Sequence, residues 1–179
     1  NSQNDNADGP NSTVGPIVSS AHLATGAMPA LSEIEFAMTL AGNAFHRWIV
    51  RCMAAAGEAE LGPLDVLVLH VVNHRDRAKR FADLCLMLNI DDTHIVTYAL
   101  KKLEKRQLIR SSRAGKEKVV EITPSGKAAC ERYRDVREAC LVGGIVNSGL
   151  EAQRLSEIAG LMRTLAGHYD QAARAAASL

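Results

Sequence analysis

The chain has 179 residues, of which 47% are hydrophobic and 23% charged, with a formal net charge of +1 at pH 7. This composition is close to the globular average, so it excludes wholesale disorder and collagen-like chains and allows one domain with a substantial core. No stretch approaches the roughly 18 unbroken apolar residues of a membrane span. Aromatic residues, at 4%, are too scarce for a platform that stacks single-stranded bases.

The basic residues are concentrated in the middle third of the chain. Residues 63–123 contain twelve Lys or Arg against eight Asp or Glu, whereas residues 1–62 contain two against six. A local excess of this size is a weak indication of a polyanionic partner, because many solvated surfaces have the same excess.

The N-terminal part of the sequence predicts a tail followed by a long helix. Residues 1–29 are rich in Asn, Ser, Gly and Pro and show no apolar period, so we expect a tail without its own core. A helix is expected over about residues 31–56, begun by a capping box of Ser32 and Glu35 and ended at Gly57. Its apolar stripe follows strict 3-4 spacing and comprises Leu31, Ile34, Met38, Ala41, Phe45, Trp48 and Cys52.

Three shorter helices are expected next, over about residues 63–74, 81–88 and 92–106. Asn89 suits the tight turn after the second of them, because Asn tolerates the left-handed conformation, and Asp91 or Asp92 caps the third. The residues expected to be buried are Leu64, Leu67, Val68 and Val71 in the first helix, Leu84, Cys85 and Leu88 in the second, and Val96, Ala99, Leu100 and Leu103 in the third.

After residue 106 the apolar period changes from 3.6 to 2, which predicts strands over 108–112 and 117–122 around a turn at 113–116. Thr123 and Pro124 then start a further helix, with Ala129, Tyr133, Val136 and Cys140 inward, which is weakened or ended at Gly143-Gly144. A last helix carries Leu155, Ile158, Met162, Leu165 and Tyr169.

The expected fold is therefore mainly α with a small β-hairpin wing. It is a winged helix-turn-helix with long flanking helices, in a single domain over residues 30–179. Its DNA-binding lobe covers about residues 63–122, and its dimerisation helices cover about 31–56 and 124–178.

The stretch from His94 to Arg110, HIVTYALKKLEKRQLIR, resembles the recognition helix and first wing strand of MarR-type transcription regulators. VVEITPSGK, over residues 119–127, is similar to that family's second wing strand and to the start of its fifth helix. The resemblance covers about residues 31–175 in element order. Three departures concern DNA contact rather than the fold: Gln107 stands where the family usually has Gly, the wing lacks an Asp-x-Arg motif, and Tyr98 occupies a position that is often Arg.

The resemblance implies that His94, Thr97, Tyr98 and Lys101 face the major groove and that Arg113 lies in the wing. The helical period agrees, because the first four residues lie opposite the buried stripe of their helix. The full set expected to bind DNA is His94, Thr97, Tyr98, Lys101, Lys102, Arg110, Arg113 and Lys116. An ordinary solvated face is the alternative, and the acids Asp91 and Asp92 count against phosphate contact.

The first and last long helices need a partner for their apolar stripes. Pairing across a two-fold axis is expected, as in the MarR-type dimer, and packing on each other within one chain is the alternative. The residues expected at the dimer interface are Leu31, Ile34, Met38, Phe45, Trp48, Leu155, Ile158, Met162 and Leu165.

The remaining candidate sites are weaker. The four cysteines show no CxxC, so we expect reduced thiols in a cytoplasmic protein, with Cys52, Cys85 and Cys140 in the core; a redox-sensing thiol is the alternative. His70 and His74 are four residues apart, a spacing that can chelate a metal, but without a third ligand we expect a partly buried His70 and an exposed His74. No catalytic motif accompanies them, so neither an enzyme nor a bound cofactor is expected.

The sequence thus predicts a dimeric, sequence-specific regulator that binds double-stranded DNA. The resemblance also allows a small-molecule effector between the dimer helices and the DNA-binding lobe. The alternative function is a winged-helix module that binds a protein and has lost DNA binding.

Overall fold

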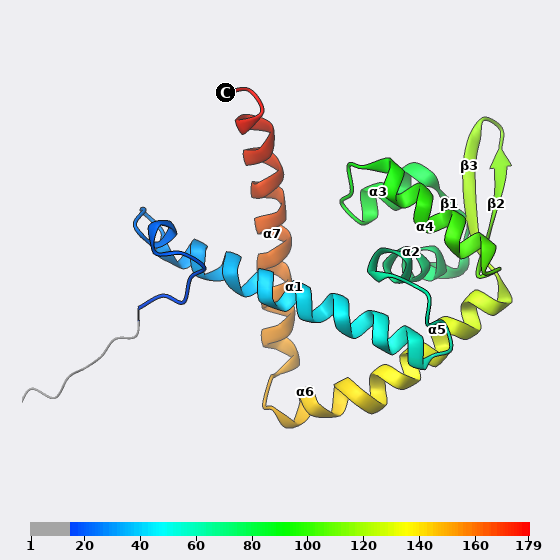
Figure 1. Cartoon of the computed structure of the whole chain (residues 1–179), viewed down its shortest axis with the longest axis horizontal. Helices are drawn as coiled ribbons and strands as arrows, with labels where there is room; N and C mark the ends of the chain where they lie inside the picture. The colour runs from blue at the N-terminus through cyan, green and yellow to red at the C-terminus, as the bar shows by residue number, and fades with distance from the viewer. Residues whose placement is uncertain (1–14) are drawn as a thin grey trace, which may run out of the picture. The chain divides into compact units, whose positions relative to one another are not determined.

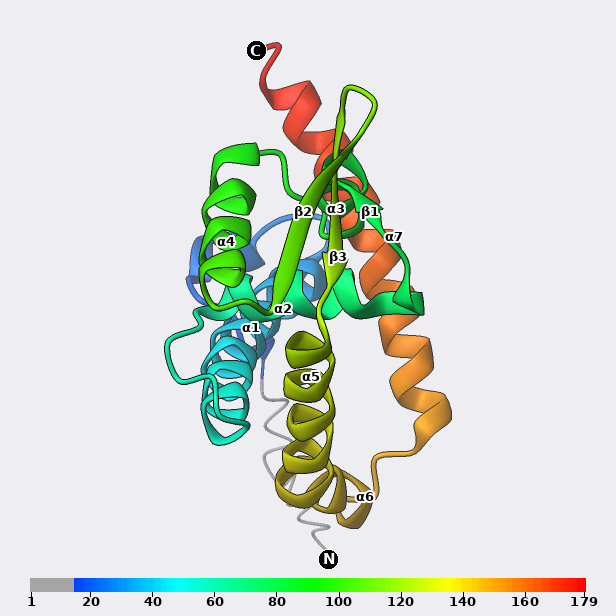
Figure 2. The same cartoon turned by 90° about the vertical axis from the view of Figure 1, so that its right-hand side faces the viewer.

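The computed structural model describes residues 15–179, so the part of the predicted tail at residues 1–14 lies outside the described residues. The chain divides into two compact units, with the boundary between Ile49 and Val50 inside the first long helix. The element order confirms a mainly α fold with a hairpin wing (Figures 1 and 2). The elements are η1 (Ala21–Ala24), α1 (Pro29–Ala55), α2 (Pro63–Asn73), η2 (His74–Asp76), β1 (Lys79–Arg80), α3 (Phe81–Met87), α4 (Thr93–Lys105), β2 (Ile109–Ala114), β3 (Glu117–Ile122), α5 (Pro124–Arg137), η3 (Glu138–Val142), α6 (Gly143–Asn147) and α7 (Ala152–Ala176).

The start of α1 differs from the prediction. The helix begins at Pro29, whose fixed φ suits a first helical position, so Ser32 lies inside the first turn and is not its cap. Ser32 is buried, and its hydroxyl donates to the carbonyl of Leu23 in the segment before the helix. The predicted capping box of Ser32 and Glu35 is therefore wrong, because the hydroxyl is used by that preceding segment.

Three helices end in the same backbone motif. The second residue after each helix has a positive φ: 100° at Gly57, 52° at Asn89 and 61° at Gln107. In each case the next N–H donates to a carbonyl five residues back, which identifies a Schellman motif. These hydrogen bonds are Glu58 to Met53 at 3.0 Å, Ile90 to Cys85 at 2.9 Å and Leu108 to Leu103 at 3.0 Å. The predicted stops at Gly57 and Asn89 are confirmed, and Gln107 adopts the conformation that a glycine would adopt without strain.

Helix α2 lies at the centre of the lobe and contacts α3, α4, α5 and β3. Because it is covered on several sides, its buried face is wider than one stripe. Val68 is buried as predicted, but Leu64, Leu67 and Val71 are only half-buried, so that part of the prediction is wrong. The fully covered apolar residues of the lobe are Val66, Val68, Leu69, Val72, Leu84, Val96, Leu100, Leu103, Leu108 and Val120.

The sheet has three strands in the order β1-β3-β2, all antiparallel. The β2–β3 hairpin is confirmed; Ala114 pairs with Glu117 across a two-residue turn, whose first residue, Gly115, has φ 64°. The short strand β1 was not predicted, and it pairs Lys79 with Val120. It covers the free edge of β3 at the wing's base, beside the start of α3.

Lys79 explains how β1 is held. Its side chain is buried, and the ammonium donates to the carbonyls of Val72 (3.3 Å), Arg77 (2.7 Å) and His74. These carbonyls lie at and just beyond the end of α2, where a helix leaves acceptors unsatisfied and favours a cation. Burial lowers the pKa of the Lys79 ammonium. The lysine is thus a structural cation that is not available to an external anion.

The C-terminal region is helical through most of its length. The run of α5, η3 and α6 continues through Gly143-Gly144 and stops at Asn147. The sequence predicted that the glycine pair weakens or ends the helix, and the pair does not end it. The departure from α geometry falls in the five preceding residues, which form a π-helical turn. After Gly149, with φ 77°, the chain enters α7, in which no residue is buried.

Candidate nucleic-acid interface

The helix-turn-helix is built by α3, the turn at Asn89 and α4. The carboxylate of Asp92 accepts a hydrogen bond from the His94 N–H at 2.9 Å, which caps α4 as predicted. The inner face of α4 is buried against the lobe. This burial fixes which face of α4 is turned outward.

The outer face of α4 brings four of the predicted residues together. His94, Tyr98 and Lys101 are exposed, and Thr97 is half-buried beside them. The Thr97 hydroxyl donates to the carbonyl of Thr93 at 2.9 Å. The Lys101 ammonium lies 5.8 Å from the centroid of the Tyr98 ring, within the range of a cation–π contact.

The tip of the wing adds exposed positive charge. Arg113 and Lys116 lie at and beside the turn between β2 and β3, and both are exposed. Within residues 15–179 no ion pair joins Arg113, Lys116 or Lys101 to a carboxylate. Their charge is therefore free to meet an anion outside the chain.

Two other residues predicted to bind DNA have partners within the lobe. The Lys102 ammonium lies 3.0 Å from a carboxylate oxygen of Asp65 on α2, and the Arg110 guanidinium lies 2.9 Å from Glu121 on β3. Both cations already have a neutralising neighbour, which sets them apart from Lys101 and Arg113. Their contact with DNA stays a prediction.

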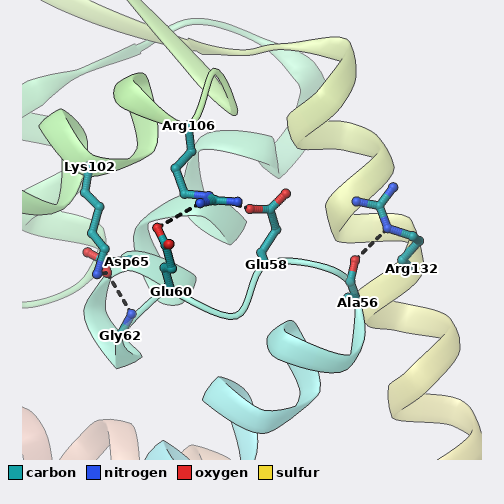
Figure 3. A network of polar contacts seen from close by, with 8 residues as sticks. All are labelled: Ala56, Glu58, Glu60, Gly62, Asp65, Lys102, Arg106 and Arg132. Carbon is teal, nitrogen blue, oxygen red and sulfur yellow. Dashed lines mark hydrogen bonds and ion pairs between the residues drawn. The ribbon is translucent and has the colours of Figure 1, made fainter.

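A polar network joins the end of α4 to the linker between α1 and α2 (Figure 3). Arg106 donates to Glu58 at 2.7 Å and to Glu60 at 2.9 Å, and Glu58 raises the pKa of Arg106. Asp65, the partner of Lys102, also accepts the Gly62 N–H at 2.7 Å and so caps α2. Sequence reasoning missed this network. The signal that could have found it is the i, i+4 spacing of Lys102 and Arg106, which places both cations on one face of α4.

Comparison with known proteins agrees with this geometry. Residues 61–126 match the family described as "Winged helix DNA-binding domain". A transcriptional regulator of the MarR family from Rhodococcus sp. RHA1 has a similar structure, with 14% sequence identity and a TM-score of 0.62 over 75% of this chain and 92% of that one. The chain has a MarR-type winged-helix fold.

Further solved structures share this MarR-type fold. A mutant of MarR from E. coli complexed with operator DNA has 13% identity and a TM-score of 0.61, covering 79% of this chain and 99% of that one. CouR from Rhodococcus jostii RHA1 bound to p-coumaroyl-CoA has 14% identity and a TM-score of 0.62, covering 74% and 91%. No curated protein matches the sequence.

The residues predicted for dimerisation are described separately in the two units. On α7 of the winged-helix unit, Leu155, Ile158 and Met162 are 40–41% exposed, and Leu165 is half-buried. On α1, Phe45 is exposed, and Leu31, Ile34, Met38 and Trp48 are half-buried. Dimer contact by these residues stays a prediction.

The cysteine prediction is wrong at one position. Cys52, Cys85 and Cys130 are buried, whereas Cys140 is exposed because it follows the last turn of α5 that packs on the lobe. Burial raises the pKa of the Cys130 thiol to about 11. Buried thiols of this kind are protonated and unreactive at neutral pH.

His70 and His74 differ in burial as predicted. His70 is half-buried, with its ring edge-on to Tyr133 at 4.5 Å between centroids, and His74 is exposed. Burial lowers the pKa of His70, and its Nε2 atom has no hydrogen-bond partner in the described part of the chain. Across residues 15–179 no three His, Cys, Asp or Glu side chains are grouped to hold a metal ion, and no helix has the length and hydropathy of a membrane span.

Proposed function

We propose that this chain is a transcription regulator that binds a specific double-stranded DNA sequence as a homodimer. The observation that carries the proposal is the outer face of α4, where His94, Tyr98 and Lys101 are exposed above a fully buried inner face. The match to a winged helix DNA-binding domain supports it. So does the operator-bound state of one structural neighbour.

The proposed contacts follow from the dimensions of the elements. Helix α4 has 13 residues, about 20 Å at 1.5 Å per residue, and fits a major groove about 12 Å wide. The wing tip with Arg113 and Lys116 would reach the phosphate backbone or the minor groove. Lys102 and Arg110 remain in the proposed set, with their charge shared with Asp65 and Glu121.

The homodimer is proposed from the stripe on α7. Leu155, Ile158 and Met162 are already more than half covered, so burying the remainder of each contributes roughly 1 kcal/mol. Several such side chains from both subunits together can offset the cost of association. A two-fold axis would set two recognition helices about 34 Å, or a multiple of it, apart, and would require a palindromic site. Sedimentation at micromolar concentration tests this: a dimer mass is expected, and a clean monomer mass would contradict it.

A small-molecule effector is proposed for a cavity of about 320 Å³ between α2 and α5. The cavity lies where the lobe meets α5, and this position supports the proposal. The cavity is lined by His70, Asn73, Cys130, Glu131, Tyr133, Arg134 and Arg137. The Nε2 atom of His70, which has no partner within the described chain, is the polar group that a ligand would satisfy.

DNA binding is tested by selection from random sequence, followed by fluorescence anisotropy at several salt concentrations. We expect an enriched motif and an affinity that falls steeply with salt. Lys101→Ala and Arg113→Ala should each weaken every sequence by about 1 kcal/mol, which is roughly fivefold. Arg174→Ala on α7 is the charge-matched control and should leave the affinity unchanged. If no motif is enriched and the affinity does not change with salt, the proposed function is wrong and the alternative, a winged-helix module that binds a protein, takes its place.

A further inference from the structure

The first two turns of α4 lack the side chains that usually read purines. Between Thr93 and Ala99 there is no Arg, Lys, Asn or Gln. In the major groove, Arg and Lys bind guanine through O6 and N7, and Asn and Gln bind adenine through N6 and N7. Bidentate reading of a purine is therefore excluded along this part of the helix, whatever operator the chain binds.

The same two turns expose apolar groups instead. Tyr98 is 71% exposed and Ile95 is 43% exposed, although both are large and lie on a helix whose other face is fully buried. The hydroxyl hydrogen of Thr97 is donated to the Thr93 carbonyl, so the methyl group and an acceptor lone pair remain for a partner. These three residues, Ile95, Thr97 and Tyr98, are named the apolar reading face. Tyr98 lies near the middle of the outward side of α4 with Ile95 and Thr97 on its two flanks, and the exposed ring of His94 lies between Thr97 and Tyr98.

A recess continues the apolar reading face toward α3 and the wing. It has a volume of about 390 Å³ and is lined by Arg80, Phe81, Ala82, Thr97, Glu117 and Lys118. Phe81 and Ala82 extend the apolar surface beyond Thr97. Two cations line this recess. Arg80 is paired with Asp83 and Glu117, whereas Lys118 forms no ion pair with a carboxylate of the described residues.

We infer that the recognition helix reads thymine methyl groups. The C5 methyl of thymine is the apolar group that the major groove presents, and apolar side chains recognise it by contact. In this arrangement the apolar reading face covers the methyls of an A·T-rich half-site centre, and Lys101, one turn further along α4, contacts a phosphate at its border. The inference rests on the proposed DNA-binding function and names the chemical group that the recognition helix contacts.

Replacing single thymines by deoxyuridine within the selected motif tests the inference. Deoxyuridine pairs with adenine as thymine does and lacks only the methyl group. Burial of one methyl group corresponds to about a fourfold change in affinity. We therefore expect about a fourfold loss at two or more central positions, and no change at thymines in the flanking sequence.

Side-chain variants assign the effect to the protein. Tyr98→Ala should bind the thymine and deoxyuridine forms equally at one of these positions, whereas Tyr98→Phe should keep the difference because the ring is retained. Lys101→Ala is the control, since it should weaken both forms by the same factor. Tyr98 and Lys101 are exposed, and circular dichroism would verify that each variant is folded.

The outcomes separate this inference from the proposed function. Tight binding to a selected motif with equal affinity for thymine and deoxyuridine forms would overturn methyl reading and leave the regulator intact. A loss in Tyr98→Phe as large as in Tyr98→Ala would also overturn it, because the hydroxyl would then be the reading group. Absence of any selected motif would overturn both.

Discussion

Replacing Gly126 by Ala tests how the wing is joined to α5. Gly126 lies in the first turn of α5, where its N–H donates to the hydroxyl of the cap residue Thr123 at 3.0 Å. A Cβ at this position would lie 2.1 Å from the carbonyl oxygen of Leu108 and 2.6 Å from Cδ1 of Ile122. The Leu108 carbonyl is part of the backbone, so it cannot rotate away as a side chain would.

The size of the effect follows from these contacts. Relief of the clash needs a backbone shift of about 1 Å, and overpacking of this kind costs about 1–3 kcal/mol. The Leu108 carbonyl accepts from the N–H of Thr123 at 3.1 Å and from its hydroxyl at 2.9 Å. Loss of both hydrogen bonds costs about 1–3 kcal/mol more, while Ala gains about 1 kcal/mol in helix propensity. We expect a net loss of about 1–5 kcal/mol.

Urea and thermal unfolding followed by circular dichroism measure this loss, which should lower Tm by roughly 2–20 °C. Gly144→Ala is the matched control, because a Cβ there meets nothing within 4 Å and Gly144 also lies in a helix. This control should be about 1 kcal/mol more stable than the natural chain. If the two variants shift stability in the same direction, the argument from the Leu108 contact is refuted.

Three further predictions concern the helix ends and the buried groups. Gln107→Gly should stabilise the chain by about 0.5–1 kcal/mol, by removing left-handed strain, and Gln107→Ala should not; urea midpoints decide. Iodoacetamide should label Cys140 in the native chain and label Cys52 and Cys130 only after unfolding, as mass spectrometry would show. Burial lowers the pKa of His70, so the folded chain favours its neutral form. The stability that this form contributes is present above about pH 6.5 and is lost as the pH falls. His70→Leu should therefore flatten the pH dependence of the urea midpoint.

The sequence predicted those parts of the fold that local pattern determines. The 3-4 spacing gave α1, α4 and α7, and the change of period gave the hairpin, because each signal is contained within one element. Strand β1 has two polar residues and no strand pattern, and it forms only because β3 offers it an edge to pair with. The capping box failed at Ser32 for a related reason, since residues before the helix compete for its hydroxyl.

The candidate site was predicted as a face but not as individual contacts. Lys101 and Lys102 are adjacent and chemically identical, yet Lys102 is paired with Asp65 and Lys101 is free of any carboxylate described in the structure. The difference arises from a carboxylate 37 positions earlier in the chain, on a helix packed beneath α4. No local pattern carries that information, because it depends on how two helices are packed.

The internal pairing of cations has a consequence for how such a protein would find its target. Lys79 is buried, and Lys102, Arg106 and Arg110 each have an acidic partner, so the charge that the lobe can offer to phosphates is well below its count of basic residues. Affinity for random DNA is almost entirely this electrostatic term. A genome presents about 10⁶–10⁹ competing sites. With Lys79, Arg80, Lys102, Arg106 and Arg110 already engaged, the lobe would dwell on each of them more briefly than its basic composition suggests. For the proposed regulator, fewer molecules would then be sequestered away from the operator, and fewer copies in the cell would suffice to occupy it.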